Sequence, residues 1–143
     1  MKVTRMKVLV LCTGNSCRSQ MAHGFLKSFS PEVDVFSAGT KPAENINPLA
    51  VKVMEEAGID ISDHTPHDVM EYLNEPWDYV ITVCGGANEN CPQFVGKSVH
   101  RIHIGFDDPS YAIGSEEYVM SEFRRVRDEI INRFEDLYNS ELK

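Results

Sequence analysis

Five residues separate Cys12 from Arg18 in the stretch LCTGNSCRSQ, residues 11–20. A cysteine thiolate is a strong nucleophile, and the planar guanidinium of arginine matches two oxygens of a tetrahedral oxyanion. Gly14, between them, allows the backbone to approach an anion closely. This spacing predicts a site in which a thiolate meets a phosphate-like oxyanion.

The elements on either side of this stretch are expected to position it. Residues 7–11, KVLVL, are typical of a buried strand, and a helix is expected from Cys17. Apolar residues recur at helical spacing along that helix: Met21, Ala22, Phe25, Leu26 and Phe29. A loop that leads from a strand into a helix N-terminus points its backbone N–H groups at one spot, which binds oxyanions. We therefore expect the oxyanion to be bound by Thr13, Gly14, Asn15, Ser16, Cys17, Arg18 and Ser19.

The positive surroundings of such a loop also favour the thiolate form of Cys12. The hydroxyl groups of Thr13 and Ser19 are placed to donate to that thiolate. Cys17, one residue before Arg18, is interpreted as a packing residue and not as a required catalyst.

Strands and helices alternate along the rest of the chain. Further strands are expected over 33–37, 79–83 and 99–104, and a short helix over 67–74. Another helix is expected to begin at Asn47-Pro48 and to end at Gly58. In the last helix, with Glu116 and Glu117 in its first turn, apolar residues step by three and four: Val119, Phe123, Val126, Ile130, Phe134 and Leu137. The pattern predicts an α/β fold, a single domain over 1–143 with a four-stranded parallel sheet and helices on both faces.

Composition limits the classes of function. The net charge of −8 argues against a nucleic-acid partner, which calls for a basic surface. The apolar run over 8–12 is too short for a signal peptide or a membrane span, so we expect a cytoplasmic monomer with no membrane partner. Thiols stay reduced there, so the four cysteines are expected to be catalytic, redox-active or metal-binding.

Residues 8–22, VLVLCTGNSCRSQMA, resemble the phosphate loop of the low-molecular-weight tyrosine phosphatase superfamily, and most of all its thioredoxin-coupled arsenate reductases. The resemblance covers nearly the whole chain. Further similar motifs are Ser37-Ala38-Gly39, Asn47-Pro48, the stretches 58–62 and 105–109, Val83-Cys84, Cys91-Pro92 and the stretch 125–129. The phosphate loop is specific for the superfamily, whereas the pair Cys84 and Cys91 separates the reductases from the phosphatases.

The resemblance implies a chemistry for each of these residues. Cys12 would attack arsenate, Cys84 would act as the second thiol and Cys91 as the resolving thiol, with thioredoxin as external reductant and no bound cofactor. Asp108, which directly precedes a proline, would be the general acid, with Asp107 as its neighbour. Phosphate or sulfate can occupy the same loop, because their shape is that of arsenate.

The spacing of Cys84 and Cys91 constrains the second part of this chemistry. In a helix, seven residues would separate their Cα atoms by about 10 Å. A disulfide needs about 4.4–6.8 Å, so the bond requires a segment that unwinds or is never helical. The glycines and asparagines between the two cysteines permit this. The alternative is that Cys84 packs in the core and Cys91 is an incidental loop thiol.

Two other functions stay open at this point. A phosphatase would use the same Cys12, Arg18 and Asp108 with water completing the cycle, and a non-enzymatic oxyanion-binding or redox-sensing protein would bind without turnover. Some similar reductases bind potassium through an asparagine, a serine and two carboxylates. Asn15 and Ser37 match, but His23 and His67 stand where the carboxylates are expected. Histidine is a poor ligand for a hard cation, so we expect no potassium site and no other metal.

Overall fold

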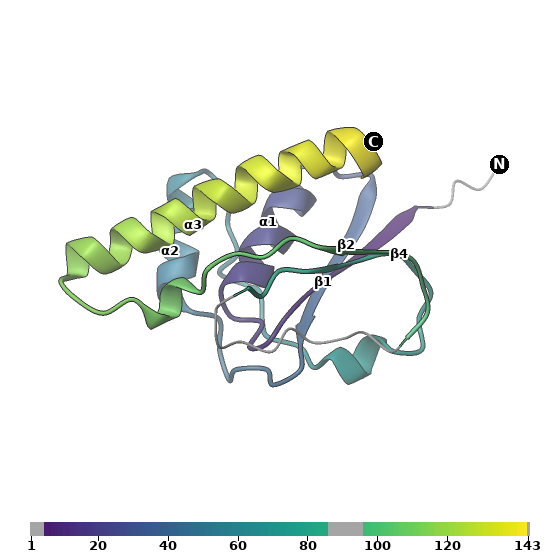
Figure 1. Cartoon of the computed structure of the whole chain (residues 1–143), viewed down its shortest axis with the longest axis horizontal. Helices are drawn as coiled ribbons and strands as arrows, with labels where there is room; N and C mark the ends of the chain where they lie inside the picture. The colour runs from purple at the N-terminus through teal and green to yellow at the C-terminus, as the bar shows by residue number, and fades with distance from the viewer. Residues whose placement is uncertain (1–4, 86–95, 143) are drawn as a thin grey trace.

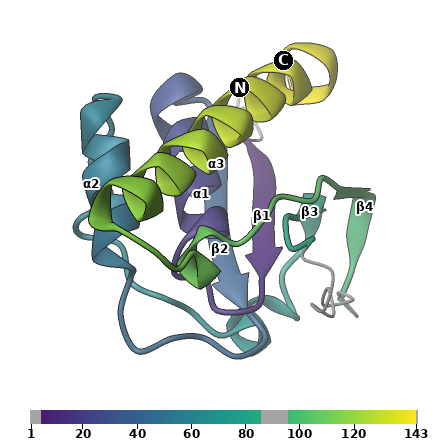
Figure 2. The ribbon, with the colours of Figure 1, turned by 60° about the vertical axis from the view of Figure 1, so that its left-hand side comes forward.

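The sheet consists of four parallel strands (Figure 1), and their order, β2-β1-β3-β4, can be followed in Figure 2. The computed structural model describes residues 5–85 and 96–142. The strands are β1 (Met6–Cys12), β2 (Val33–Gly39), β3 (Trp77–Thr82) and β4 (Ser98–His103). Cys12 pairs with Gly39, and Leu11 pairs with Thr82. The carboxyl ends of three strands therefore meet at one edge, where ligands of such sheets bind.

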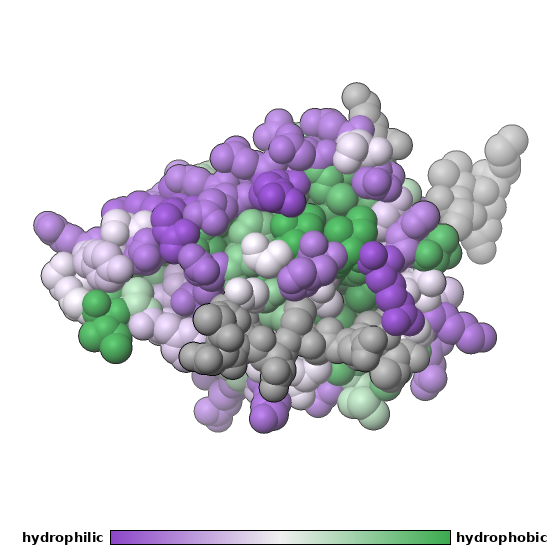
Figure 3. Space-filling model, in the orientation of Figure 1, coloured by the Kyte–Doolittle hydropathy of each residue, from purple (hydrophilic) through white to green (hydrophobic). Residues whose placement is uncertain are grey.

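Three α-helices cover one face of the sheet: α1 (Arg18–Phe29), α2 (Pro48–Glu56) and α3 (Glu116–Leu137), as Figure 2 shows. α3 packs across α1 and α2 through Phe123, Val126, Ile130 and Phe134, each at most 1% exposed. Its outer side is hydrophilic (Figure 3). The helical spacing of apolar residues in the sequence correctly predicts this face, because it puts them on one side of α3, which is buried against α1 and α2.

Among the residues that the structure describes, one short helix covers the other face of the sheet. The 3₁₀ helix η1 (Val69–Tyr72) lies where a short helix is predicted, and its Asp68 and Glu71 form a capping box. The η1 segment packs on a second apolar cluster that contains Leu9, Leu11 and Trp77. Helices on both faces are therefore confirmed, but they are unequal in size.

Two helix ends show how local sequence sets the fold. The Asn47 side chain accepts a hydrogen bond from the Leu49 N–H at 2.9 Å and caps α2, and Gly58 takes a φ of 80° just beyond it. Phe29, the last residue of the predicted apolar face of α1, is 40% exposed because the helix ends there.

The remaining helical turns are η2 (Pro109–Tyr111) and the π turn η3 (Tyr138–Leu142). Within residues 5–85 and 96–142, no helix is long and apolar enough to cross a membrane.

Candidate active site

Hydrogen-bond donors surround the sulfur of Cys12. This cysteine is the last residue of β1 and is 2% exposed. The backbone N–H of Asn15 donates to Cys12 Sγ at 3.1 Å, and Ser19 Oγ lies 2.9 Å from the same sulfur. Asn15 adopts a φ of 52°, a left-handed conformation that asparagine tolerates better than most residues. This turn aims its N–H back at the thiol.

The protons around Ser19 can be assigned from the network. Asn15 Nδ2 donates to Ser19 Oγ at 2.7 Å, while Asn15 Oδ1 accepts from the backbone N–H of His67 at 2.9 Å. Since Ser19 Oγ accepts from Asn15, its own hydroxyl hydrogen is left to donate to Cys12. Two hydrogen-bond donors therefore point at the Cys12 sulfur.

The carbonyl groups of the loop point away from its centre. The segment 41–47 supplies the donors: Lys41 N–H to Thr13 O at 2.9 Å, Ala43 N–H to Gly14 O at 2.8 Å and Asn47 N–H to Ser16 O at 3.0 Å. The C=O and N–H of a trans peptide point in opposite directions. The N–H groups that follow these carbonyls therefore face inward, which is the arrangement that cradles an oxyanion.

Arg18 and Asp108 meet over this loop. Arg18 is 3% exposed, and its guanidinium donates to Phe106 O at 3.2 Å and to Asp108 Oδ2 at 3.3 Å. The other carboxylate oxygen of Asp108 accepts from the N–H and the hydroxyl of Ser110, at 2.9 and 2.7 Å. Asp107 instead pairs with Arg125 of α3 at 3.1 Å. The fold thus places Asp108, and not Asp107, beside the loop.

Cys17 occupies the N-cap of α1 and is 4% exposed. Burial, together with the nearby charge of Asp108, raises the pKa of its thiol to about 12. A neutral, buried thiol fits the interpretation of Cys17 as a packing residue. Among the described residues its side chain makes no capping bond, so the positive N-terminal end of α1 is open to an anion.

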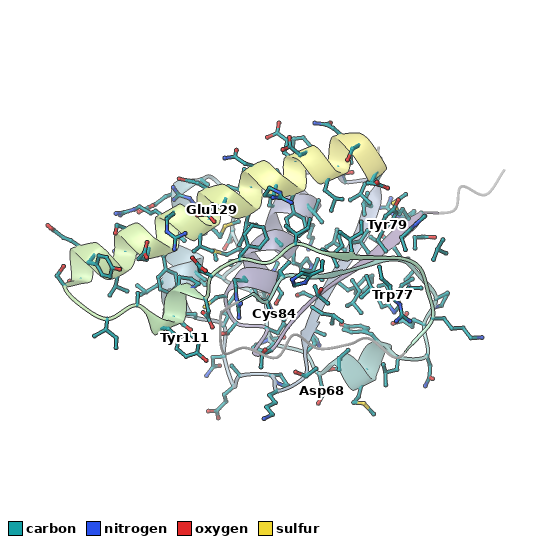
Figure 4. All side chains as sticks on the ribbon, in the orientation of Figure 1. Asp68, Trp77, Tyr79, Cys84, Tyr111 and Glu129 are labelled. Atoms are coloured by element: carbon teal, nitrogen blue, oxygen red, sulfur yellow. The ribbon has the colours of Figure 1, made fainter. Side chains whose placement is uncertain are left out.

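Cys84 lies two residues beyond the end of β3 and is fully buried (Figure 4). Val83 N–H donates to Leu11 O at 2.9 Å, so the pairing of β1 and β3 continues up to the residues just before Cys84 and Cys12. Cys84 is disulfide-bonded, whereas Cys12 and Cys17 are free thiols. Cys91 lies outside the described residues.

The side chains of His23, Ser37 and His67, which were considered for a potassium site, make hydrogen bonds. His23 Nδ1 lies 2.8 Å from Ser37 Oγ, and the ring of His67 faces Glu71 at 3.3 Å. Burial, and then the proximity of His64, lowers the pKa of His23 to about 3, so this imidazole is neutral. In the part of the chain that the structure describes, no three His, Cys, Asp or Glu side chains come together as metal ligands.

Sequence reasoning missed two parts of the site. Gln20 is 1% exposed and bonds to the loop, and the segment 41–47 orients the loop carbonyls. Gln20 follows Ser19 directly, but a single sequence does not show that a polar residue in the first turn of a helix faces inward. The role of 41–47 depends on pairing between distant segments.

Comparisons with known proteins agree with this geometry. The profile of the "Low molecular weight phosphotyrosine protein phosphatase" family matches residues 7–143. An arsenate reductase of Halalkalibacterium halodurans is 49% identical over 127 residues, 88% of this chain and 90% of that protein. An arsenate reductase of Bacillus subtilis is 48% identical over 130 residues, 90% of this chain and 92% of that protein.

Solved structures show the same fold. An arsenate reductase in its phosphate-binding state has a TM-score of 0.78 and 32% identity, and the match covers 94% of this chain and 97% of the other. A thioredoxin-dependent arsenate reductase of Corynebacterium glutamicum has a TM-score of 0.66 and 30% identity, with 96% of this chain and 62% of the other covered.

Proposed function

The chain belongs to the low molecular weight phosphotyrosine protein phosphatase family, and on that premise we propose that it is an arsenate reductase that works through three cysteines and is recycled by thioredoxin. Residues 1–143 form its one domain. The reducing cytoplasm is the compartment in which such thiols remain available. The identity of about half the residues with curated arsenate reductases supports the reaction class.

The first step joins Cys12 to arsenic. Arsenate sits in the loop 13–18, held by the inward N–H groups and by Arg18. The Cys12 thiolate attacks arsenic, an S–As bond forms and an As–O bond breaks. Asp108 gives the leaving oxygen its proton, so that water departs, and arsenic stays in the +5 state.

The second and third steps move electrons between thiols. The Cys84 thiolate attacks the sulfur of Cys12, an S–S bond forms, and the S–As electron pair passes to arsenic, which leaves as arsenite in the +3 state. The Cys91 thiolate then attacks Cys84 and releases the Cys12 thiolate. A thioredoxin dithiol finally reduces the Cys84–Cys91 bond, which supplies the two electrons that arsenate has consumed.

The covalent pairing of Cys84 is the observation that supports this proposal. Cys84 is disulfide-bonded while Cys12 is a free thiol among hydrogen-bond donors. The relay needs Cys84 to form a disulfide with a thiol other than Cys12 and Cys17, and this geometry permits such a bond. A phosphatase cycle contains no step that oxidises Cys84.

Phosphatase chemistry is the alternative, and one observation favours it. Tyr111 lies in η2, just beyond Asp108, and is 78% exposed (Figure 4). An exposed aromatic ring beside the acid can stack on an aromatic phosphate ester. We therefore expect at most a weak side activity of this kind.

The test follows NADPH consumption with thioredoxin, thioredoxin reductase and arsenate. Wild type turns over, Cys91→Ser releases one arsenite per enzyme and then stops, and Cys17→Ser, the matched control, keeps cycling. Sustained turnover in Cys91→Ser would show that Cys91 is not the resolving thiol. The protein is a phosphatase if the wild type consumes no NADPH with arsenate while wild type and Cys91→Ser hydrolyse aryl phosphates equally well.

A further inference from the structure

A line of four hydrogen bonds connects His64, in the loop before η1, to the sulfur of Cys12. The contacts are His64 Nδ1 to Gln20 Oε1 at 2.9 Å, Gln20 Nε2 to Asn15 Oδ1 at 3.2 Å, Asn15 Nδ2 to Ser19 Oγ at 2.7 Å and Ser19 Oγ to Cys12 Sγ at 2.9 Å. Gln20, Asn15 and Ser19 are each at most 1% exposed. Water therefore does not compete for these bonds.

The direction of the line is set at Gln20. Its Nε2 faces three oxygens that can only accept: Asn15 O at 3.2 Å, Asn15 Oδ1 at 3.2 Å and Thr65 O at 3.1 Å. Reversing the amide would set an oxygen against all three. Gln20 Oε1 is therefore the atom that faces His64 and can only accept, so His64 donates through Nδ1–H.

Gln20 Nε2 has two hydrogens for three acceptors, two of which belong to Asn15, so at least one hydrogen goes to Asn15. Gln20 donates to Asn15, Asn15 donates to Ser19, and Ser19 has only its hydroxyl hydrogen left for Cys12. Every bond points the same way, toward the sulfur. Aligned hydrogen bonds in a dry interior polarise one another, which makes the last donor stronger than an isolated serine hydroxyl.

We propose that Gln20 and His64 are positioning residues which orient and polarise this line and so hold Cys12 as a reactive thiolate. They touch neither the arsenic nor the sulfur and act through Asn15 and Ser19. The inference rests on the proposed role of Cys12 as nucleophile.

The surroundings of His64 are compatible with a neutral donor. Lys27 and His23 face it from α1, and Asp60 and Asp63 from its own loop. The rings of His23 and His64 lie 4.6 Å apart, centre to centre. Burial lowers the pKa of His64, although Asp63 opposes this, so at neutral pH its one ring proton belongs on Nδ1. A second proton would leave the Nδ1–H donor in place.

The chain allows a test that separates donation from mere filling of space. In His64→Asn the side-chain amide can reach the position of Nδ1 and still donate to Gln20, whereas His64→Ala removes the donor. Gln20→Met keeps the length of the side chain and removes both of its polar atoms. His100→Ala is the control, because His100 is an exposed histidine of β4 that stacks on Tyr79.

The readout is the reactivity of Cys12 itself. The reduced proteins are treated with iodoacetamide over a range of pH, and mass spectrometry follows alkylation of the peptide that contains Cys12. We expect the midpoint of the pH profile to move upward by about 0.5–1 unit in His64→Ala and Gln20→Met, which slows alkylation about three- to tenfold at pH values well below the wild-type midpoint. The profiles of His64→Asn and His100→Ala should match that of wild type.

Two results overturn the proposal: an unchanged profile in His64→Ala, or an equal shift in His64→Asn and His64→Ala. Circular dichroism shows whether Gln20→Met is folded. If it is not, the comparison of His64→Ala with His64→Asn decides by itself whether the proposal holds. If the wild type reduces no arsenate but the variants show the expected shifts in Cys12 reactivity, the proposed function is refuted and the positioning role of Gln20 and His64 is supported.

Discussion

Gly39 is the residue whose replacement tests the geometry of the oxyanion loop most directly. It pairs with Cys12 in the sheet, and a Cβ atom added to it would lie 2.3 Å from the carbonyl oxygen of Thr13. Real Cβ atoms essentially never come closer than 3.0 Å, so in Gly39→Ala the loop has to retreat by about 0.7 Å. The obstacle is backbone, so no rotamer change relieves it.

The magnitude follows from what Thr13 does. Its carbonyl accepts from Lys41 N–H at 2.9 Å, and the peptide that it belongs to turns an N–H toward the anion. A displacement approaching 1 Å at a site that depends on orientation costs up to about 100-fold, so we expect phosphate affinity to fall about 10- to 100-fold. Overpacking should lower the free energy of unfolding by about 1–3 kcal/mol.

Calorimetric titration with inorganic phosphate measures the affinity, and urea unfolding measures the stability. Gly58→Ala is the matched control: Gly58 has a φ of 80° and nothing within 4 Å of an added Cβ. It lies beyond the end of α2 that points away from the loop, so it should lose about 1–2 kcal/mol of stability through backbone strain while keeping its phosphate affinity. Wild-type affinity in Gly39→Ala would refute the assigned loop geometry.

Three further predictions concern charge. Burial lowers the pKa of His23 to about 3, so its contribution to stability is complete above about pH 6.5 and is lost as the pH falls toward 3. Urea unfolding at pH 5 should therefore show about 2 kcal/mol less stability than at pH 7.5. The variant His23→Gln, which does not titrate, should remove that difference. Hydrogen bonds from Arg124, and then Arg127, lower the pKa of the exposed Glu56 to about 2. The stability that Glu56 contributes is present above about pH 4.5 and is lost as the pH falls through 2. In Glu56→Gln the free energy of unfolding should therefore depend less steeply on pH within that window. Potassium should alter arsenate kinetics no more than sodium at equal ionic strength, because Asn15 Oδ1 already accepts two N–H donors; strong activation specific to potassium would contradict this.

Much of the architecture is readable from local pattern. The strand ends are off by at most two residues, and Asn47, Pro48 and Gly58 mark α2 correctly, because caps and breakers act within a few residues. The face of α3 is readable for the same reason, since helical periodicity reports burial directly. The unequal covering of the sheet is not readable, because it depends on which helices the crossovers send to each face.

The candidate active site likewise contains some features that local sequence predicts and others that it does not. The spacing of Cys12, Gly14 and Arg18 predicts a loop after a strand and before a helix, and the structure has that loop. Neighbouring carboxylates look equivalent in sequence, yet Asp108 faces Arg18 while Asp107 turns to α3. That choice depends on the path of the chain after β4, which no local pattern encodes.

Residue order by itself therefore establishes which groups are available: a thiol, a guanidinium and a flexible glycine within one turn of chain, followed by a helix. Their chemistry is local because covalent spacing limits how far apart they can be. The tertiary structure decides which way each hydrogen bond points. Gln20 receives its donor from His64 and Thr13 its donor from Lys41, across 44 and 28 residues of sequence. Only the packing of α1 against β2 and the loop before η1 brings those partners together, since hydrogen bonds form at about 3 Å whatever the separation in sequence.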